Sequence, residues 1–223
     1  CMLSSHSVQE AMDLAGVAHL AAIEGHVPFM HFFDGFRTSH EIQKVEMMDY
    51  EVLKGLVNQE ALASYRKQSL NPHTNPVTRG GAENDDIFFQ GMEARNQHYD
   101  KVPEIVARYM KEISKVTGRE YAPFTYYGAE DAERIIVAMG SVTECAKETI
   151  DALVAKGEKV GMIKVHLYRP FSVKYLLDVL PATVKKIAVL DRTKETGSIG
   201  EPLYLDILSA LKDKDIEIIG GRY

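Results

Sequence analysis

The sequence predicts an α/β protein with two sheet-centred domains, the second built on a mostly parallel sheet. Three observations support this fold class. From residue 134 to the end, short apolar runs alternate with amphipathic runs, which is typical of βαβ units. The first part of the chain holds a capped helix followed by an apolar run that ends in polar residues. The pattern changes near residues 117–124, so we place a boundary there, between domains 1–118 and 119–223.

The first domain is expected to begin with a helix over residues 7–25. Ser7 and Glu10 match the S-x-x-E capping box, in which each side chain binds the backbone N–H of the other residue. The apolar run 27–33 predicts a short strand of the kind that is covered on both faces in parallel sheets. A loose alternation of apolar and polar residues predicts a second strand over residues 42–48.

Two helices are expected within residues 49–70, before a long run that has no periodicity. Residues 71–86 contain two prolines and two glycines, and a loop of this length is usually functional or a strap across other structure. Within this run, residues 78–81 could form a backbone nest for an anion, although a geometric need for glycine is the favoured interpretation. A helical pattern resumes over residues 87–118, with a break expected near residues 100–103.

The second domain follows a regular order of strand and helix. Strands are predicted over residues 134–141, 159–168, 185–193 and 215–221, with helices over residues 142–157, 172–180 and 201–212.

Composition limits the classes of function. The net charge of -6 gives no basic face for nucleic acid, and no apolar run approaches the ~18 residues of a membrane span. The two cysteines, Cys1 and Cys145, are too few for a disulfide framework, which indicates a reducing, cytoplasmic compartment. They are also too few for a cubane iron–sulfur cluster, which takes four thiolates. The N-terminus lacks the pattern of a signal peptide, and we expect the chain to be a segment of something longer.

The loop 34–41 is the first candidate site, because ligands bind at the carboxyl ends of strands in open α/β sheets. In this loop, Asp34, Arg37 and Thr38 are the candidate residues, and Arg37 could clamp a carboxylate or phosphate. The favoured alternative is structural. In it, Asp34 and Ser39 serve as turn and cap residues, while Arg37 makes an ion pair between domains.

The loop 188–198 is the corresponding candidate in the second domain. Asp191, Arg192 and Lys194 follow a predicted strand and precede a helix whose N-terminus could bind an anion. The glycine pattern of this loop matches neither a dinucleotide fingerprint nor a P-loop. Interface salt bridges are therefore favoured over ligand binding.

Two further patterns are interpreted as structural. Ser141 with Glu144 matches a second capping box, and the G-x-S-x-G pattern of a nucleophile elbow is absent. The eight histidines show no zinc-binding spacing. His31, Asp34 and His40 could meet at a metal only through folding, so hydrogen-bonded polar roles are favoured.

Five stretches in collinear order carry a specific family resemblance: "SSHSVQEAMDLA", "VPFMHFFDGFRTSHEIQKVE", "YYGAEDAERIIVAMGS", "KVHLYRPFS" and "KKIAVLDRTKE…GEPLYLD". They resemble the pyruvate:ferredoxin (flavodoxin) oxidoreductases over nearly the whole chain. The resemblance implies a multidomain, dimeric enzyme that uses thiamine diphosphate, Mg²⁺ and iron–sulfur clusters. Such an enzyme converts pyruvate and coenzyme A into acetyl-CoA and CO₂ and reduces ferredoxin or flavodoxin.

The resemblance also implies what this chain lacks. Residues 1–118 resemble the later part of the pyrimidine-binding (thiamine diphosphate) domain, and residues 119–223 resemble the C-terminal domain of transketolase. No catalytic residue and no metal ligand carries over, and no cofactor is expected on this segment alone, which is expected to be inactive. The expected partners are the remaining domains of the enzyme, with no nucleic acid and no membrane. The open alternatives are another 2-oxoacid:ferredoxin oxidoreductase, a transketolase-like enzyme, or a non-catalytic interaction module.

Overall fold

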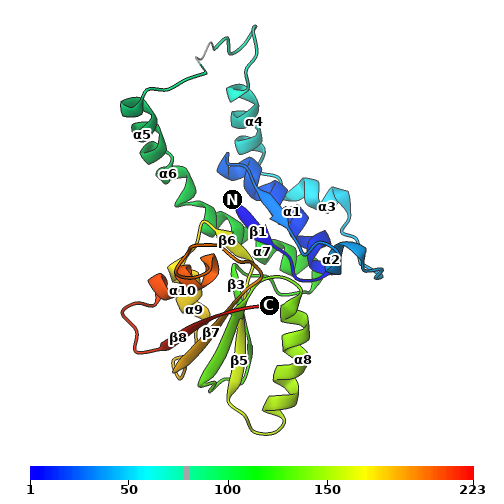
Figure 1. Ribbon diagram of the computed structural model, residues 1–223. Coiled ribbons are helices and arrows are strands. Elements are labelled where there is room, and N and C mark those ends of the chain that lie inside the picture. The colour runs from blue at the N-terminus through cyan, green and yellow to red at the C-terminus, as the bar shows by residue number, and fades with distance from the viewer. Residues whose placement is uncertain (78–80) are drawn as a thin grey trace.

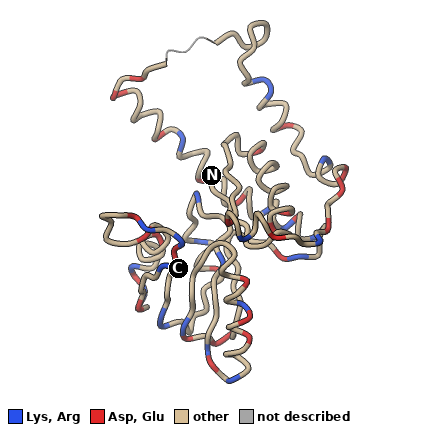
Figure 2. Tube along the Cα trace, turned by 45° about the vertical axis from the view of Figure 1, so that its right-hand side comes forward, with Lys and Arg blue, Asp and Glu red and all other residues tan. Residues whose placement is uncertain are grey.

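The structure, a computed structural model, describes residues 1–77 and 81–223. It contains one three-stranded and one five-stranded sheet, each with its own hydrophobic core (Figure 1). The predicted anion nest at residues 78–81 lies, except for Gly81, outside the described residues. Positive and negative side chains are interleaved along the chain (Figure 2), as the composition predicts.

The three-stranded sheet has the order β2-β1-β6. Strand β1 (Met2–Ser4) pairs in parallel with β2 (Met30–Phe32) and antiparallel with β6 (Leu167–Arg169). The long helices α1 (Val8–Gly25) and α7 (Val102–Thr117) pack against each other beside this sheet. Their core consists of fully buried aliphatic side chains, among them Leu14, Val17, Val106 and Ile113.

The five-stranded sheet has the order β3-β5-β4-β7-β8, and only β3 runs antiparallel. Its strands are β3 (Phe124–Gly128), β4 (Arg134–Ala138), β5 (Val160–Val165), β7 (Lys186–Asp191) and β8 (Glu217–Arg222). Helices α9 (Val173–Val179) and α10 (Pro202–Ala210) cover one face, and α8 (Val142–Val154) lies on the other (Figure 1). Alternate strand residues, such as Ile135 and Val137, therefore point into the buried α9–α10 side.

Short helices complete the first half. They are α2 (Arg37–His40), α3 (Tyr50–Leu56), α4 (Gln59–Gln68), α5 (Asp85–Ala94) and α6 (Asn96–Tyr99). Residues 59–77 and 81–99 extend away from both sheets and are called the arm below (Figure 1). Helix α5 in this arm carries exposed apolar side chains, including Phe88 and Phe89, which are 51% and 66% exposed.

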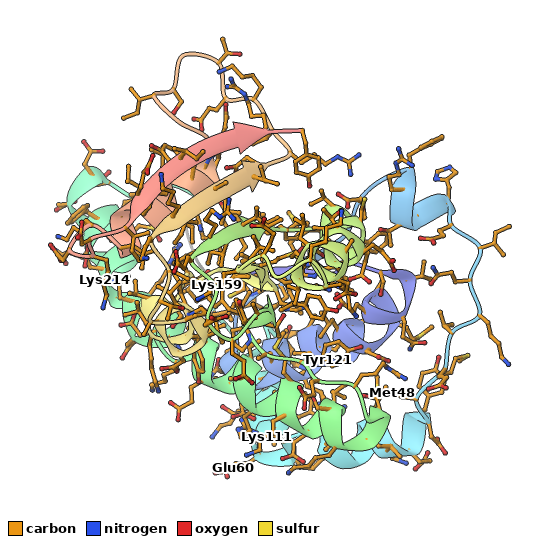
Figure 3. All side chains as sticks on the ribbon, turned by 90° about the horizontal axis from the view of Figure 1, so that it is seen from below. Met48, Glu60, Lys111, Tyr121, Lys159 and Lys214 are labelled. Atoms are coloured by element: carbon orange, nitrogen blue, oxygen red, sulfur yellow. The ribbon has the colours of Figure 1, made fainter. Side chains whose placement is uncertain are left out.

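The halves of the chain are joined, among other places, at His166 and at the connection between α7 and β3. His166 alone separates β5 from β6, so the chain passes directly from the large sheet to the small one. The connection between α7 and β3 is anchored to α1, because the buried carboxylate of Asp13 accepts hydrogen bonds from Arg119 Nε at 2.7 Å and Tyr121 Oη at 2.6 Å. Tyr121 lies among the packed side chains there (Figure 3). The boundary at residue 118 stays a prediction.

The observed helices and strands agree with the predicted ones throughout the second half and only in part in the first half. All seven predicted elements of the second half are present, and the helix over residues 87–118 is broken at Arg95 and Lys101. The prediction of a strand over residues 42–48 was wrong, because these residues form no regular structure and are largely exposed. The prediction that the strand within residues 27–33 is covered on both faces was also wrong, because Met30 of β2 is 60% exposed. Strand β2 also lies at the edge of its sheet, so of the described strands only β1 pairs with it. Within residues 1–77 and 81–223, the search for a helix long and apolar enough to cross a membrane found none.

Candidate functional site

The two predicted strand-end loops meet at a single carboxylate, that of Asp34. Its Oδ1 lies 2.7 Å from Arg192 Nη1, and its Oδ2 accepts the backbone N–H of Ser141 at the start of α8. Gly140 makes this approach possible, because a Cβ at that position would lie 2.7 Å from Asp34 Oδ2. Asp34 therefore connects the loop after β2 to two loops of the five-stranded sheet.

Opposing effects set the charge of Asp34. Burial raises the pKa of its carboxyl group, but hydrogen bonds from Ser141 and Arg192 outweigh burial and hold the pKa below its usual range. Asp34 is thus ionised at neutral pH. Its negative charge lies at the N-terminus of α8, where the positive end of the helix dipole stabilises it. An ion pair between the halves exists, as predicted for the loop 188–198, because Arg192 pairs with Asp34, whereas the pair predicted for Arg37 is absent from residues 1–77 and 81–223.

Asp191 has a structural role. It is 4% exposed, and its carboxylate accepts the backbone N–H groups of Leu203 at 3.0 Å and Tyr204 at 3.1 Å, at the start of α10. Lys194 lies 3.6 Å from Glu201, which also pairs with Arg222 at 2.7 Å. These contacts hold the loop 188–198 within its own domain.

Arg37 and Thr38 have no comparable partners. Arg37 is exposed in α2 and forms no ion pair with any described residue, and the Oγ1 of the buried Thr38 lacks a hydrogen bond. Ser39 has the predicted turn role, since its Oγ accepts the N–H of Phe36 at 2.8 Å. Arg37 is therefore the cation of this loop that is left available for a ligand.

A cleft of about 1090 Å³ lies between the loop 34–41 and the start of α8. Its lining includes Arg37 and His40 of the first half and Ser141, Cys145 and Arg192 of the second half. Glu41 and Glu144 also line the cleft, and Arg192 is paired with Asp34, so Arg37 is the guanidinium of this lining that could meet an anionic group.

The second predicted capping box is wrong. The Ser141 side chain makes no cap hydrogen bond, and the Glu144 carboxylate pairs with Lys164 of β5 instead. The first capping box is half right. Ser7 Oγ accepts the N–H of Glu10, but the Glu10 carboxylate accepts the N–H of His6 at 2.8 Å.

A buried cluster of His6, Glu10 and His166 was not anticipated. In the described part of the chain, it is the one group of three potential metal ligands whose ligand atoms lie within 4.8 Å of one another. Burial and the neighbouring His166 lower the pKa of His6 to about 3, so its imidazole is neutral at physiological pH. The spacing of His6 and Glu10 was visible in the sequence, whereas His166 is brought in only by the fold.

The predicted trio of His31, Asp34 and His40 is not brought together as a metal site in the described residues. His31 Nε2 instead pairs with Ser5 Oγ at 2.6 Å, and His40 Nδ1 with Ser39 Oγ at 2.9 Å.

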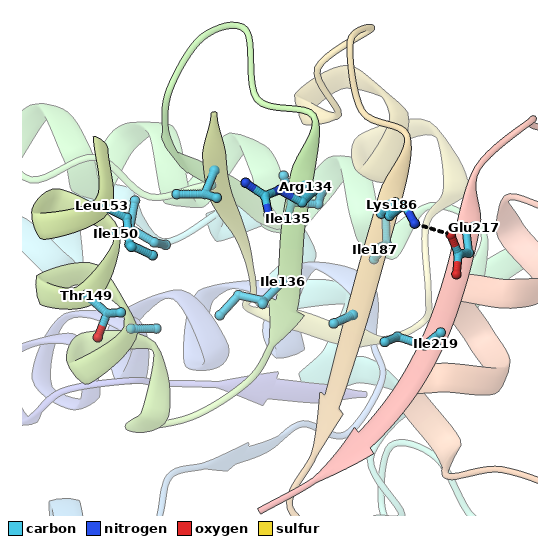
Figure 4. Close-up of a pocket in the computed structure, with 14 residues that line it drawn as sticks. Arg134, Ile135, Ile136, Thr149, Ile150, Leu153, Lys186, Ile187, Glu217 and Ile219 are labelled. Carbon is cyan, nitrogen blue, oxygen red and sulfur yellow. Dashed lines mark ion pairs between the residues drawn. The ribbon is translucent and has the colours of Figure 1, made fainter. Parts of the chain in front are cut away.

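The α8 face of the large sheet is only partly covered. An apolar pocket of about 440 Å³ lies beside α8, and Ile136, Ile150 and Ile219 line it (Figure 4). At its rim, Lys186 and Glu217 form an ion pair at 2.7 Å. Its apolar lining suits packing against another element better than binding a charged substrate.

Two family models match the chain. Residues 1–111 match "Pyruvate flavodoxin/ferredoxin oxidoreductase, thiamine diP-bdg", and residues 132–222 match "Pyruvate:ferredoxin oxidoreductase core domain II".

Curated relatives match over all of this chain. The chain is 58% identical to the pyruvate-flavodoxin oxidoreductase of Enterobacter agglomerans and 57% identical to the pyruvate:ferredoxin oxidoreductase of Moorella thermoacetica. It is 47% identical to a mitochondrial NADP⁺ pyruvate dehydrogenase of Euglena gracilis. The chain spans 19% of the length of the first two relatives and 12% of the third.

A solved structure has a similar fold. It is the 2-oxoglutarate:ferredoxin oxidoreductase of Magnetococcus marinus with 2-oxoglutarate, coenzyme A and succinyl-CoA bound. The TM-score is 0.53 at 17% identity, with 99% of this chain and 38% of that chain covered. At this identity the likeness supports the α/β fold alone.

Proposed function

The chain belongs to the pyruvate:ferredoxin (flavodoxin) oxidoreductase family, and we propose that it forms a wall of the active-site region in a longer enzyme of that activity. That enzyme oxidatively decarboxylates pyruvate with coenzyme A, giving acetyl-CoA and CO₂, and passes the released electron pair to ferredoxin or flavodoxin. The observation that carries the proposal is the match of both halves, in order, to two segments of one family.

The described residues do not fit the Mg²⁺ ion and the iron–sulfur clusters of this reaction. Mg²⁺ prefers oxygen ligands, whereas the metal-ligand cluster found here contains two imidazoles. The two cysteines lie on separate halves, and a cubane cluster needs four thiolates. We therefore assign the ligands of Mg²⁺ and of the iron–sulfur clusters to other parts of the longer enzyme.

The contribution of this chain is architectural, with one proposed ligand contact. Asp34 fixes the two halves against each other, so the cleft keeps its shape. Arg37 lines that cleft and forms no ion pair with the residues that the structure describes, and it is proposed to contact an anionic group of substrate or cofactor. We further propose that this chain packs against the remaining domains of the enzyme, that the enzyme is a homodimer, and that it is located in the cytoplasm.

The experiment is a substrate comparison with the full-length enzyme that contains this chain. Reduction of ferredoxin and of flavodoxin is measured with coenzyme A and either pyruvate or 2-oxoglutarate. We expect turnover with pyruvate to exceed turnover with 2-oxoglutarate. A preference for 2-oxoglutarate, or no reduction with either acid, would contradict the proposed activity.

A further inference from the structure

The cluster of His6, Glu10 and His166 lies where the two sheets meet. His6 precedes α1, Glu10 lies in the first turn of α1, and His166 separates β5 from β6. Both histidines are 1% exposed. The proposed function gives this cluster no role.

The spacing of the three side chains suits a shared ion better than direct hydrogen bonds. Glu10 Oε2 lies 3.5 Å from His6 Nδ1 and 3.5 Å from His166 Nε2. A hydrogen bond between such groups is normally about 2.7–3.2 Å long. Two ligands of a tetrahedral zinc ion, each bonded at about 2.1 Å, are separated by roughly 3.4 Å.

Hydrogen bonding leaves nitrogen lone pairs free in the cluster. His6 Nε2 lies 3.1 Å from the carbonyl oxygen of Val165, which can only accept, so Nε2 carries the proton. The Nδ1 atom of His6 is then an unprotonated acceptor, and no described residue hydrogen-bonds to it. Within the same described residues, neither ring nitrogen of His166 has a hydrogen-bond partner. Buried nitrogens without partners are unusual, and a bound cation would satisfy two of them.

We propose that His6, Glu10 and His166 bind a divalent transition-metal ion of the zinc type, which clasps the two halves of the chain together. Two imidazoles and one carboxylate suit zinc, whereas Mg²⁺ and Ca²⁺ prefer all-oxygen sites. His6 also contributes to the lining of the 1090 Å³ cleft, which provides a path for the ion. The imidazole rings are stacked, with centroids 4.3 Å apart and planes at 24°, so binding must turn one ring to aim both lone pairs at the ion.

The test measures zinc in the full-length enzyme, because its iron–sulfur clusters contain none. The protein is loaded with zinc and desalted, and its metal content is determined by mass spectrometry. We expect about one zinc per chain in the wild type and less than a tenth of that in Glu10→Gln and in His166→Gln. Glu60→Gln and His98→Gln change the same residue types at exposed positions and are expected to retain the ion. Full zinc content in Glu10→Gln would overturn the assignment.

A second measurement uses only the wild type, so it tests the proposed site even if His166→Gln does not fold. Anomalous diffraction at the zinc edge, on crystals of the loaded wild type, is expected to place one ion between His6, Glu10 and His166. No anomalous peak there would overturn the proposal, even with zinc bound elsewhere.

Discussion

At the scale of single residues, the contacts between the halves depend on a few side chains, among them Asp13 and Asp34. The sequence marks Asp34 as a polar residue at a strand end, which is where the structure places it. Its partners Ser141 and Arg192 lie more than a hundred residues away, and no local pattern connects them. The sequence therefore predicted an interface salt bridge for the loop that contains Arg192, but it did not predict Asp34 as the partner, and the pair expected for Arg37 is not formed among the described residues.

Replacing Asp34 by alanine is expected to destabilise the chain. The change leaves the Arg192 guanidinium and the Ser141 N–H without their partner, which costs about 1–2 kcal/mol after allowing for the partial exposure of Arg192. Urea unfolding followed by circular dichroism measures the loss. Asp131→Ala, which removes an exposed pair with Lys159, is the matched control and is expected to leave the midpoint unchanged. Equal midpoints for both variants would show that Asp34 does not hold the halves together.

The pH dependence of the Asp34 contribution follows from its lowered pKa. The stabilising effect is fully present above the ordinary carboxyl pKa of about 4 and is lost as the pH falls through the lower pKa of the folded state. The stability difference between wild type and Asp34→Asn should thus be constant from about pH 5 to 8 and shrink only below about pH 4. Urea midpoints across this range measure the difference. A difference that disappears already near pH 6 would mean that the carboxyl pKa is raised, not lowered.

Arg37 gives the residue-scale test of ligand contact. In the full-length enzyme, Arg37→Ala is expected to raise the KM for pyruvate or coenzyme A about tenfold or more, because a charge-assisted hydrogen bond is lost. Arg66→Ala, on the exposed surface of α4, is the control. Wild-type kinetics in the Arg37 variant would leave Arg37 with an architectural role only.

At the scale of elements, prediction succeeded where periodicity and packing agree. The second-half strands and helices were found because their apolar residues are buried in one core, as Ile135, Val137, Ile187 and Val189 are. The strand over residues 42–48 failed because alternation alone does not create a partner strand. The two capping boxes failed in part because His6 and Lys164 compete for the glutamates, which local spacing cannot reveal.

The arm of residues 59–77 and 81–99 provides a test at this scale. Phe89 is 66% exposed in this chain, so Phe89→Ser should change its stability by less than about 0.5 kcal/mol. If other domains of the full-length enzyme cover α5, the same change should cost about 1–3 kcal/mol there. Unfolding of both proteins by urea measures the two values. The same small effect in both would mean that the other domains leave this side chain exposed.

At the scale of the whole molecule, the structure consists of two sheets joined at His166 and at Asp34, with apolar surface left on the arm and on the α8 face of the large sheet. Such surface is expected where further parts of a larger protein pack. The chain also spans only 19% of its first two relatives. The division into two α/β halves was predictable from periodicity, whereas the contacts between the halves depend on residues distant in sequence.

The central claim is that this chain shapes the enzyme but does not carry its chemistry. The most direct measurement is the coenzyme A-dependent reduction of ferredoxin by pyruvate, with the purified 223-residue chain and the full-length enzyme side by side, both supplied with thiamine diphosphate and Mg²⁺. We predict turnover by the full-length enzyme and none by the chain alone. Pyruvate-dependent reduction by the chain alone would contradict the claim.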